Sequence, residues 1–295
     1  MVTLLGDSLD VAHDFHSAWR LIERNPTLYE MVLVDCHGFD HKDILTFVRS
    51  VRENVSPLFP RIFLSYAPFD VDLIKAGVDE FINEERLIEP LIFDFGNVGY
   101  LTSFTGFMSD LFKFKDSYLF EHSIRVKTFT RLFTMLCVEA GLIDSVFATN
   151  ITLASFFHDL GKLVIPDSIL NKPSSLSEDE FSVVKMHTTF GAKMLEKLIR
   201  TFREEKFLTI LFNVVKYHHE RYDGGGYPEG LKEKQIPLEA RIVAIMDVFE
   251  ALMSDRPYRT AYTFEEALRI VKNDEDHFDP EILQIFLANS EYFRC

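Results

Sequence analysis

The sequence predicts an α/β domain with a parallel sheet over residues 1–100 and an all-helical domain over residues 101–295. Three observations support this fold class. In the first hundred residues, short apolar runs alternate with amphipathic stretches, which is typical of β-α-β units. Beyond residue 101, longer amphipathic stretches with helical periodicity take their place. The length of 295 residues exceeds the usual ~100–200 residues of one domain, so two domains are expected.

Three buried strands are expected in the first domain, at residues 1–6, 31–36 and 61–66, each followed by a polar turn and a helix-like pattern. The helix expected at residues 41–54 places five apolar side chains on one face, namely Ile44, Leu45, Phe47, Val48 and Val51. Because parallel strands need a crossover connection, this order of elements predicts a parallel sheet.

Seven helical stretches are expected in the second domain, and prolines separate them as helix breakers do. The stretches cover residues 103–139, 144–158, 178–200, 203–219, 238–254, 264–272 and 280–288. Ser177 followed by Glu180 has the pattern of a capping box, in which each side chain accepts a hydrogen bond from the other residue's backbone N–H.

The composition excludes several classes of function. The chain carries 31 Lys and Arg against 46 Asp and Glu, a net charge of −15, which argues against a protein that coats a nucleic-acid polymer. No run of about 18 apolar residues occurs, so no membrane span is expected. The N-terminus lacks the pattern of a secretory signal. The three cysteines lie far apart, as in a reducing compartment, so we expect a cytoplasmic protein.

Potential metal ligands gather in the helical half, and they are His122, the pair His158-Asp159, His187, the pair His218-His219, and Asp247. Histidines combined with carboxylates suit borderline metals such as iron, manganese, zinc or cobalt. A carboxylate has two oxygens and can bridge two cations, which a neutral imidazole cannot do. A single histidine is more often an ordinary core or surface residue. This alternative weakens for the set, because several of these positions lie in short phrases of specific composition.

Those phrases are FFHDLGKLVIPDSILNKPSSLSEDEF, KMHTTFG, YHHERYDGGGYPEGL, IPLEARIVAIMDVFEALMSDRPYR and HFDP. In this order and spacing they closely resemble the HD-GYP domain, a family of bacterial cyclic di-GMP phosphodiesterases within the HD metal-hydrolase superfamily. The resemblance covers residues 117–288 and implies an HD-type helical fold. A bare HD dipeptide would be weak evidence, since His13-Asp14 forms one in the first domain.

The resemblance implies two divalent transition-metal ions, with iron as the first choice and manganese as the alternative. One ion would be bound by His122, His158 and Asp247, and the second by His187, His218 and His219. Asp159 would bridge the two ions. Some members of the family recruit a third metal with a Glu four residues before the first histidine, but this chain has Tyr118 there.

The resemblance also implies hydrolysis of cyclic di-GMP to linear pGpG, to GMP, or to both. Asp159 and Lys162 would act in catalysis, and the substrate would be contacted by Lys162, Tyr227, Arg256 and Arg259. In the family the GYP loop is associated with protein partners. Two alternatives stay open: a metal-binding cyclic di-GMP receptor with little turnover, and an HD hydrolase of another nucleotide. Glu250 stands where the family has an Asp, and Glu233 where Gly is common.

The first domain resembles a response-regulator receiver. Asp35 falls at a strand end where the phosphorylated Asp would lie, and Ser65 falls where the hydroxyl would lie. Strand one offers only Asp7, and the expected Lys is replaced by Glu84. Phosphoryl acceptance needs Mg²⁺ on a carboxylate cluster and a lysine. We therefore expect a degenerate receiver that senses or docks without phosphorylation, the alternative being an unrelated α/β domain.

Overall fold

A computed structural model describes residues 1–6, 9–25, 28–55, 61–65, 67, 70–82, 98–201, 206–255 and 260–294. The chain separates into two compact units, Met1–Leu111 and Phe112–Cys295, and the division falls inside helix α5 (Val98–Lys115). The domain limits expected from the sequence, at residues 100 and 101, stay a proposal.

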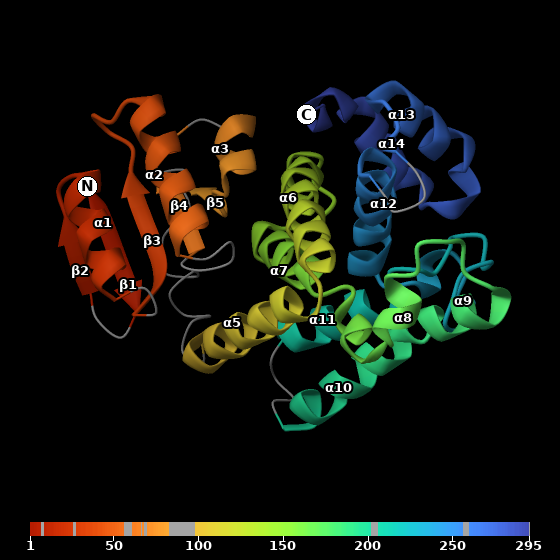
Figure 1. Ribbon diagram of the computed structural model, residues 1–295. Helices are drawn as coiled ribbons and strands as arrows, with labels where there is room; N and C mark the ends of the chain where they lie inside the picture. Colours follow the sequence, from red (N-terminus) through yellow and green to blue (C-terminus); the bar gives the residue numbers. More distant parts are fainter. Residues whose placement is uncertain are drawn as a thin grey trace. The chain divides into compact units, whose positions relative to one another are not determined.

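The first unit contains a five-stranded sheet in the order β2-β1-β3-β4-β5 (Figure 1). Its strands are β1 (Val2–Gly6), β2 (Leu9–Ala12), β3 (Tyr29–Asp35), β4 (Arg61–Ser65) and β5 (Glu80–Ile82). The α/β class is confirmed. The expectation of a parallel sheet is right for β3, β4 and β5 and wrong for β1, which pairs antiparallel with both β2 and β3.

The antiparallel pairing follows from strand β2, which the sequence patterns did not predict. Only two residues separate β1 from β2, and so short a link joins antiparallel strands only. Helix α1 (Phe15–Arg24) then leads from β2 to β3, so these two strands run parallel with β1 between them. The unit is therefore an α/β unit with a mixed sheet.

The direction of β1 changes the comparison with a receiver. Gly6, at the end of β1, pairs with Tyr29 at the start of β3, whereas the backbone N–H of Asp35 donates to the carbonyl of Met1 at 2.9 Å. The end of β1 therefore lies at the opposite end of β3 from Asp35. Asp7 and Glu84 lie outside the described residues.

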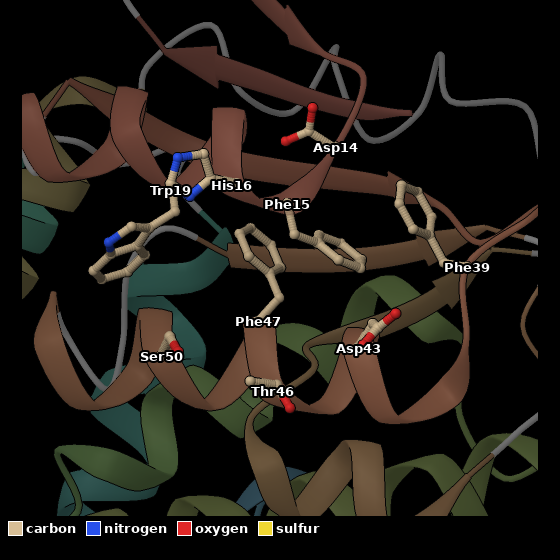
Figure 2. A pocket seen from close by; sticks show the side chains of 9 residues that line it. All are labelled: Asp14, Phe15, His16, Trp19, Phe39, Asp43, Thr46, Phe47 and Ser50. Carbon is tan, nitrogen blue, oxygen red and sulfur yellow. The ribbon is translucent and has the colours of Figure 1, made fainter.

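Helix α2 (His41–Asn54) confirms the predicted apolar face, because Ile44, Phe47, Val48 and Val51 are buried and Leu45 is partly buried against the same core. Helix α3 (Val71–Ala76) is short. Aromatic rings lie between α1 and α2, where Phe15 stacks on Phe39 at 4.3 Å and on Phe47 at 4.7 Å (Figure 2). They line a cavity of about 490 Å³ together with Trp19.

The second unit is helical, as predicted. Its helices are α6 (Ser117–Glu139), α7 (Ser145–Phe156), α8 (Asp167–Leu170), α9 (Glu178–Lys185), α10 (His187–Thr201), α11 (Lys206–Tyr217), α12 (Leu238–Met253), α13 (Phe264–Asn273) and α14 (Pro280–Ala288). The expected helix at 103–139 is interrupted at Asp116, whose carboxylate accepts from the N–H groups of Tyr118 and Leu119 and starts α6. The expected helix at 178–200 is interrupted at Met186. The capping box of Ser177 and Glu180 is confirmed.

Phenylalanine rings from α6, α12, α14 and the last turn of the chain build part of the helical core. Phe249 lies 5.1 Å from Phe286, and Phe286 lies 5.2 Å from Phe293 between ring centroids. The rings of Phe249 and Phe286 pack edge to face, an arrangement that stabilises a core beyond the burial of area alone. This core fixes α6 against α12, and these two helices carry two of the predicted ligands, His122 and Asp247. Among the described residues, no helix is long and apolar enough to cross a membrane.

Candidate metal centre

All seven predicted ligand residues come together in the second unit. They form two groups, one of Asp159, His187, His218 and His219 and the other of His122, His158 and Asp247. Within each group, one ligand atom of every residue lies within 4.8 Å of the others. All are buried except His219, whose side chain is 26% exposed. The residues come from α6, α12, the start of α10 and the turns that follow α7 and α11.

The group around His122 is tightly packed. Nε2 of His122 lies 3.2 Å from Nε2 of His158 and 3.2 Å from Oδ1 of Asp247. Nε2 of His158 lies 3.5 Å from the same carboxylate oxygen. Three potential ligand atoms therefore converge on one point, which could hold a divalent metal ion.

Asp159 faces both groups with different oxygens. Its Oδ2 atom lies 3.2 Å from Nε2 of His158. Its Oδ1 atom lies 3.3 Å from Nε2 of His187 and 3.9 Å from Nε2 of His218. The carboxylate therefore spans the space between the two groups of ligand atoms.

Three of the histidine rings form a hydrogen bond through Nδ1, which leaves Nε2 of each ring available to bind a metal ion. Nδ1 of His158 contacts the carbonyl of Ser155 at 2.8 Å, and Nδ1 of His187 contacts that of Val184 at 2.7 Å. Nδ1 of His218 has the same kind of contact, at 2.9 Å with a carbonyl of α11. A carbonyl can only accept, so each Nδ1 carries a hydrogen, and in the neutral ring each Nε2 presents a lone pair.

The Nε2 atoms of His187 and His218 therefore face Oδ1 of Asp159 without a hydrogen atom between them. Within the described part of the chain, Oδ1 of Asp159 is buried and accepts no hydrogen bond. Several acceptors that face one another repel unless a cation lies among them. The donor set therefore fits divalent metal ions at this place.

The pKa values follow the same electrostatics. Burial lowers the pKa of His187 to about 4 and that of His219 to about 3, so both are neutral near pH 7, as metal ligands must be. Burial also opposes a charge on His158, but the carboxylates of Asp159 and Asp247 outweigh it and raise the pKa of this histidine to about 10. The group around His158 thus favours a positive charge between its two carboxylates.

Glu250 is a functional residue that sequence reasoning missed. It is 1% exposed and accepts from Nδ1 of His122 at 2.5 Å, from Nε of Arg125 and from the hydroxyl of Ser254. Burial would raise its pKa, but these contacts lower it to about 2. A carboxylate behind a ligating histidine fixes the ring and its tautomer. The signal was in the sequence, since Glu250 follows Asp247 by three residues on one helix and so lies on the same face.

Lys162 lies beside the centre, with Nζ 2.6 Å from Oδ2 of Asp159. Burial would raise the pKa of Asp159, but the charges of Lys162 and His158 hold it well below the usual range. The preceding Gly161 allows this turn to lie close to the start of α10, since a Cβ at position 161 would lie 1.8 Å from the carbonyl oxygen of His187. Only glycine lets this turn pack against the start of α10.

The GYP loop, which contains Gly226, Tyr227 and Pro228, packs against the ligand group that includes His219. The ring of Tyr227 lies 4.9 Å from that of His219, and its backbone N–H donates to the carbonyl of His219 at 3.1 Å. Arg221 donates to both Asp223 and Asp274. These hydrogen bonds hold the residues that precede the GYP loop.

Glu220 is a second residue that sequence reasoning did not assign. It is 2% exposed, and its carboxylate accepts from the backbone N–H groups of Glu229, Gly230 and Leu231. Glu220 therefore links the segment before the GYP loop to the segment after it. Arg256 and Arg259, the expected phosphate contacts, lie outside the described residues.

A helical unit that gathers histidines and aspartates into two adjoining groups of potential ligands is typical of a metal-binding protein. The chain belongs to the HD domain family, which matches residues 107–282. It is 32% identical over 244 residues to a cyclic di-GMP phosphodiesterase of Thermotoga maritima, covering 82% of this chain and 61% of that protein. It is 38% identical over 175 residues to the cyclic di-GMP phosphodiesterase PA4108 of Pseudomonas aeruginosa, covering 59% of this chain and 40% of that protein.

The chain thus spans less than two thirds of the length of either curated relative. Among solved structures, an HDG"Y"P protein of Bdellovibrio bacteriovorus matches 96% of this chain and 82% of that chain, with a TM-score of 0.50 and 16% identity. This is a similarity of fold. It agrees with the HD-type helical fold expected from the sequence.

Proposed function

We propose that this protein hydrolyses the phosphodiester bonds of cyclic di-GMP, giving linear pGpG, GMP or both. The observation that carries the proposal is the buried carboxylate of Asp159, which presents one oxygen to each of two histidine groups. Two cations held this close are suited to in-line displacement at phosphorus. The similarity to proteins named cyclic di-GMP phosphodiesterases supports the substrate.

The proposed cofactors are two divalent transition-metal ions, iron first and manganese as the alternative. His122, His158 and Asp247 would hold one ion, and the second would be held by His187, His218 and His219, with Asp159 shared. A mixed set of imidazoles and carboxylates suits these metals. When bound, the ions supply a water of lowered pKa and stabilise the charge on the attacking and leaving oxygens.

The chain's own residues would orient the substrate. Lys162 carries its ammonium group 2.6 Å from the shared carboxylate, close enough for a phosphate at the centre to meet this charge. Tyr227 is half-buried beside His219 and offers a ring and a hydroxyl to the substrate. Arg256 and Arg259 would clamp phosphate oxygens, because a guanidinium group binds them in bidentate fashion.

The first unit would act as a sensory or docking unit that is not phosphorylated. The pairing of β1 with β3 supports this role. Gly6, which ends β1, lies beside the start of β3, whereas Asp35 lies at the end of β3. An acidic cluster that binds Mg²⁺ would need the ends of β1 and β3 on the same side of the sheet. Protein partners would bind through this unit or through the GYP loop. A cytoplasmic location, expected from the widely spaced cysteines, is part of the proposal.

Two other functions differ from this one in a measurable way. A receptor with little turnover would bind metals and cyclic di-GMP but leave the nucleotide intact. An HD hydrolase of another nucleotide would cleave a different member of a substrate panel.

The deciding experiment is metal analysis of anaerobically purified protein, followed by turnover assays with iron or manganese. The panel holds cyclic di-GMP, cyclic di-AMP, cyclic GMP-AMP and GTP. We expect about two metal ions per chain, from the two groups of ligands, and the fastest cleavage with cyclic di-GMP. Tight binding of cyclic di-GMP without any cleavage would favour the receptor, and faster cleavage of another nucleotide would favour the third function.

A further inference from the structure

A groove of about 800 Å³ lies in the second unit between helix α14 and the residues Tyr222 and Asp223, which precede the GYP loop. Its floor is apolar and includes Phe278, Leu283 and Leu287. Its rim is acidic and includes Glu233, Glu275 and Asp276. We call these six residues and the space between them the acidic groove. None of them belongs to the metal centre.

The rim carboxylates are available for an incoming charge. Glu233, Glu275 and Asp276 are exposed, and none of the three forms a side-chain ion pair within the described part of the chain. The neighbouring Asp274 is different, because Arg221 already neutralises it at 2.8 Å. The rim therefore keeps three negative charges above an apolar floor.

The backbone at Glu233 adopts an uncommon conformation. Glu233 has a φ of +52°, in the left-handed region that side chains other than glycine rarely adopt. Glycine, which is common at this position in the family, would adopt it without strain. Replacing Glu233 by glycine would therefore remove both this strain and one charge of the rim.

We propose that the acidic groove binds a basic amphipathic helix of a separate partner protein. An apolar stripe of that helix would cover Phe278, Leu283 and Leu287, and its Lys or Arg side chains would meet the rim. Charge selects this occupant. Residues 1–100 carry a net charge of −9 and the rest of the chain −6, so neither a second copy of this protein nor its own first domain is complementary to the rim.

Binding can be measured on the full-length protein with a synthetic probe. The probe is a fluorescein-labelled 18-residue peptide of Leu and Lys with all leucines on one helical face, followed by fluorescence polarisation. A peptide of the same composition with scattered leucines tests whether the apolar stripe matters. We expect the amphipathic peptide to bind more tightly, and its affinity to fall as salt rises.

Variants locate the binding site. Glu233→Gln, Glu275→Gln and Asp276→Asn should each weaken binding about twofold to fivefold, the range of a partly exposed ion pair. Glu233→Gly relieves the backbone strain and should weaken binding as much as Glu233→Gln, because both remove the charge. Glu139→Gln removes an exposed carboxylate at the end of α6 and should bind like the parent.

Carbodiimide cross-linking followed by mass spectrometry supplies a second readout. We expect lysines of the peptide to be joined to Glu233, Glu275 or Asp276. Cross-links only to carboxylates elsewhere would overturn the proposal, as would rim variants that bind the peptide as tightly as Glu139→Gln. Neither measurement uses nucleotide cleavage, so the result is independent of the proposed enzymatic function.

Discussion

Replacing Glu250 by alanine tests whether this carboxylate orients His122 for metal binding. The change leaves Nδ1 of His122 without its acceptor in a site that is 2% exposed. An unpaired buried donor costs about 1–3 kcal/mol. The other two partners can bind water instead and contribute little to this cost, since the side chain of Arg125 is 39% exposed and Ser254 is half-buried. The expected loss of folding stability is about 2–3 kcal/mol.

Metal binding should weaken as well, because a residue that orients a ligating histidine typically contributes a factor of about 10–100 to affinity. That factor corresponds to about 1.4–2.7 kcal/mol. The assay is titration of metal-free protein with Mn²⁺, with unfolding measured separately in urea. Glu250→Asp, which keeps a carboxylate on a shorter side chain, should recover part of the affinity.

Glu239→Ala is the matched control. Glu239 lies on the same helix, is buried, and accepts a hydrogen bond from Asn213 at 2.7 Å, away from the ligands. It should lower stability and leave the affinity for Mn²⁺ unchanged. Equal metal affinity in Glu250→Ala and Glu239→Ala would refute the orienting role of Glu250.

Four further outcomes are expected. Asp159→Ala should reduce the metal content as well as turnover, by elemental analysis, because its two oxygens lie 3.2 Å and 3.3 Å from the two ligand groups; an unchanged content would contradict its shared role. Incubation with acetyl phosphate and Mg²⁺ should leave the mass at Asp35 unchanged, whereas one added phosphoryl group would restore the receiver interpretation. Burial raises the pKa of Cys36 to about 11, so its alkylation at pH 8 should be about tenfold slower than that of a free thiol, by peptide mass spectrometry. Arg221 lowers the pKa of Asp223 and of Asp274, so these pairs stabilise the fold above the usual carboxylate range and lose that effect as the pH falls through the lowered values; the melting temperature should drop less between pH 5 and 3 in Arg221→Ala than in the parent.

The sequence predicted most of the helical unit because amphipathic periodicity and capping residues act locally. Ser177 and Glu180 lie three residues apart, so their capping box needs no knowledge of the rest of the chain. The break at Asp116 was missed because an aspartate in a helical pattern is read as an exposed residue as readily as a cap. Strand β2 was missed for a related reason, since four residues are too few to show alternation.

The roles of Glu250 and Glu220 depended on tertiary structure. Glu250 binds a histidine 128 residues away in sequence. Its spacing from Asp247 places it on the same face of α12, but no local pattern shows which ligand it contacts. Glu220 accepts from N–H groups nine to eleven residues further along, which become neighbours only when the GYP loop closes. The family phrases marked the ligands themselves, but hydrogen bonds that orient the ligands depend on packing.

The helix ends explain how adjacent residues can serve one centre. Side chains of consecutive residues in an α-helix point about 100° apart, so a continuous helix through His158-Asp159 or His218-His219 would direct one member of each pair away. The sequence predicted one helix that ends on His158, at 144–158, and another that runs through both His218 and His219, at 203–219. Instead α7 ends at Phe156 and α11 at Tyr217. Asp159 has φ −91° and ψ 17°, in the bridge region, and this turn lets its two oxygens face both ligand groups. Ending each helix just before its ligand pair is therefore what allows two neighbouring residues to reach the same metal centre.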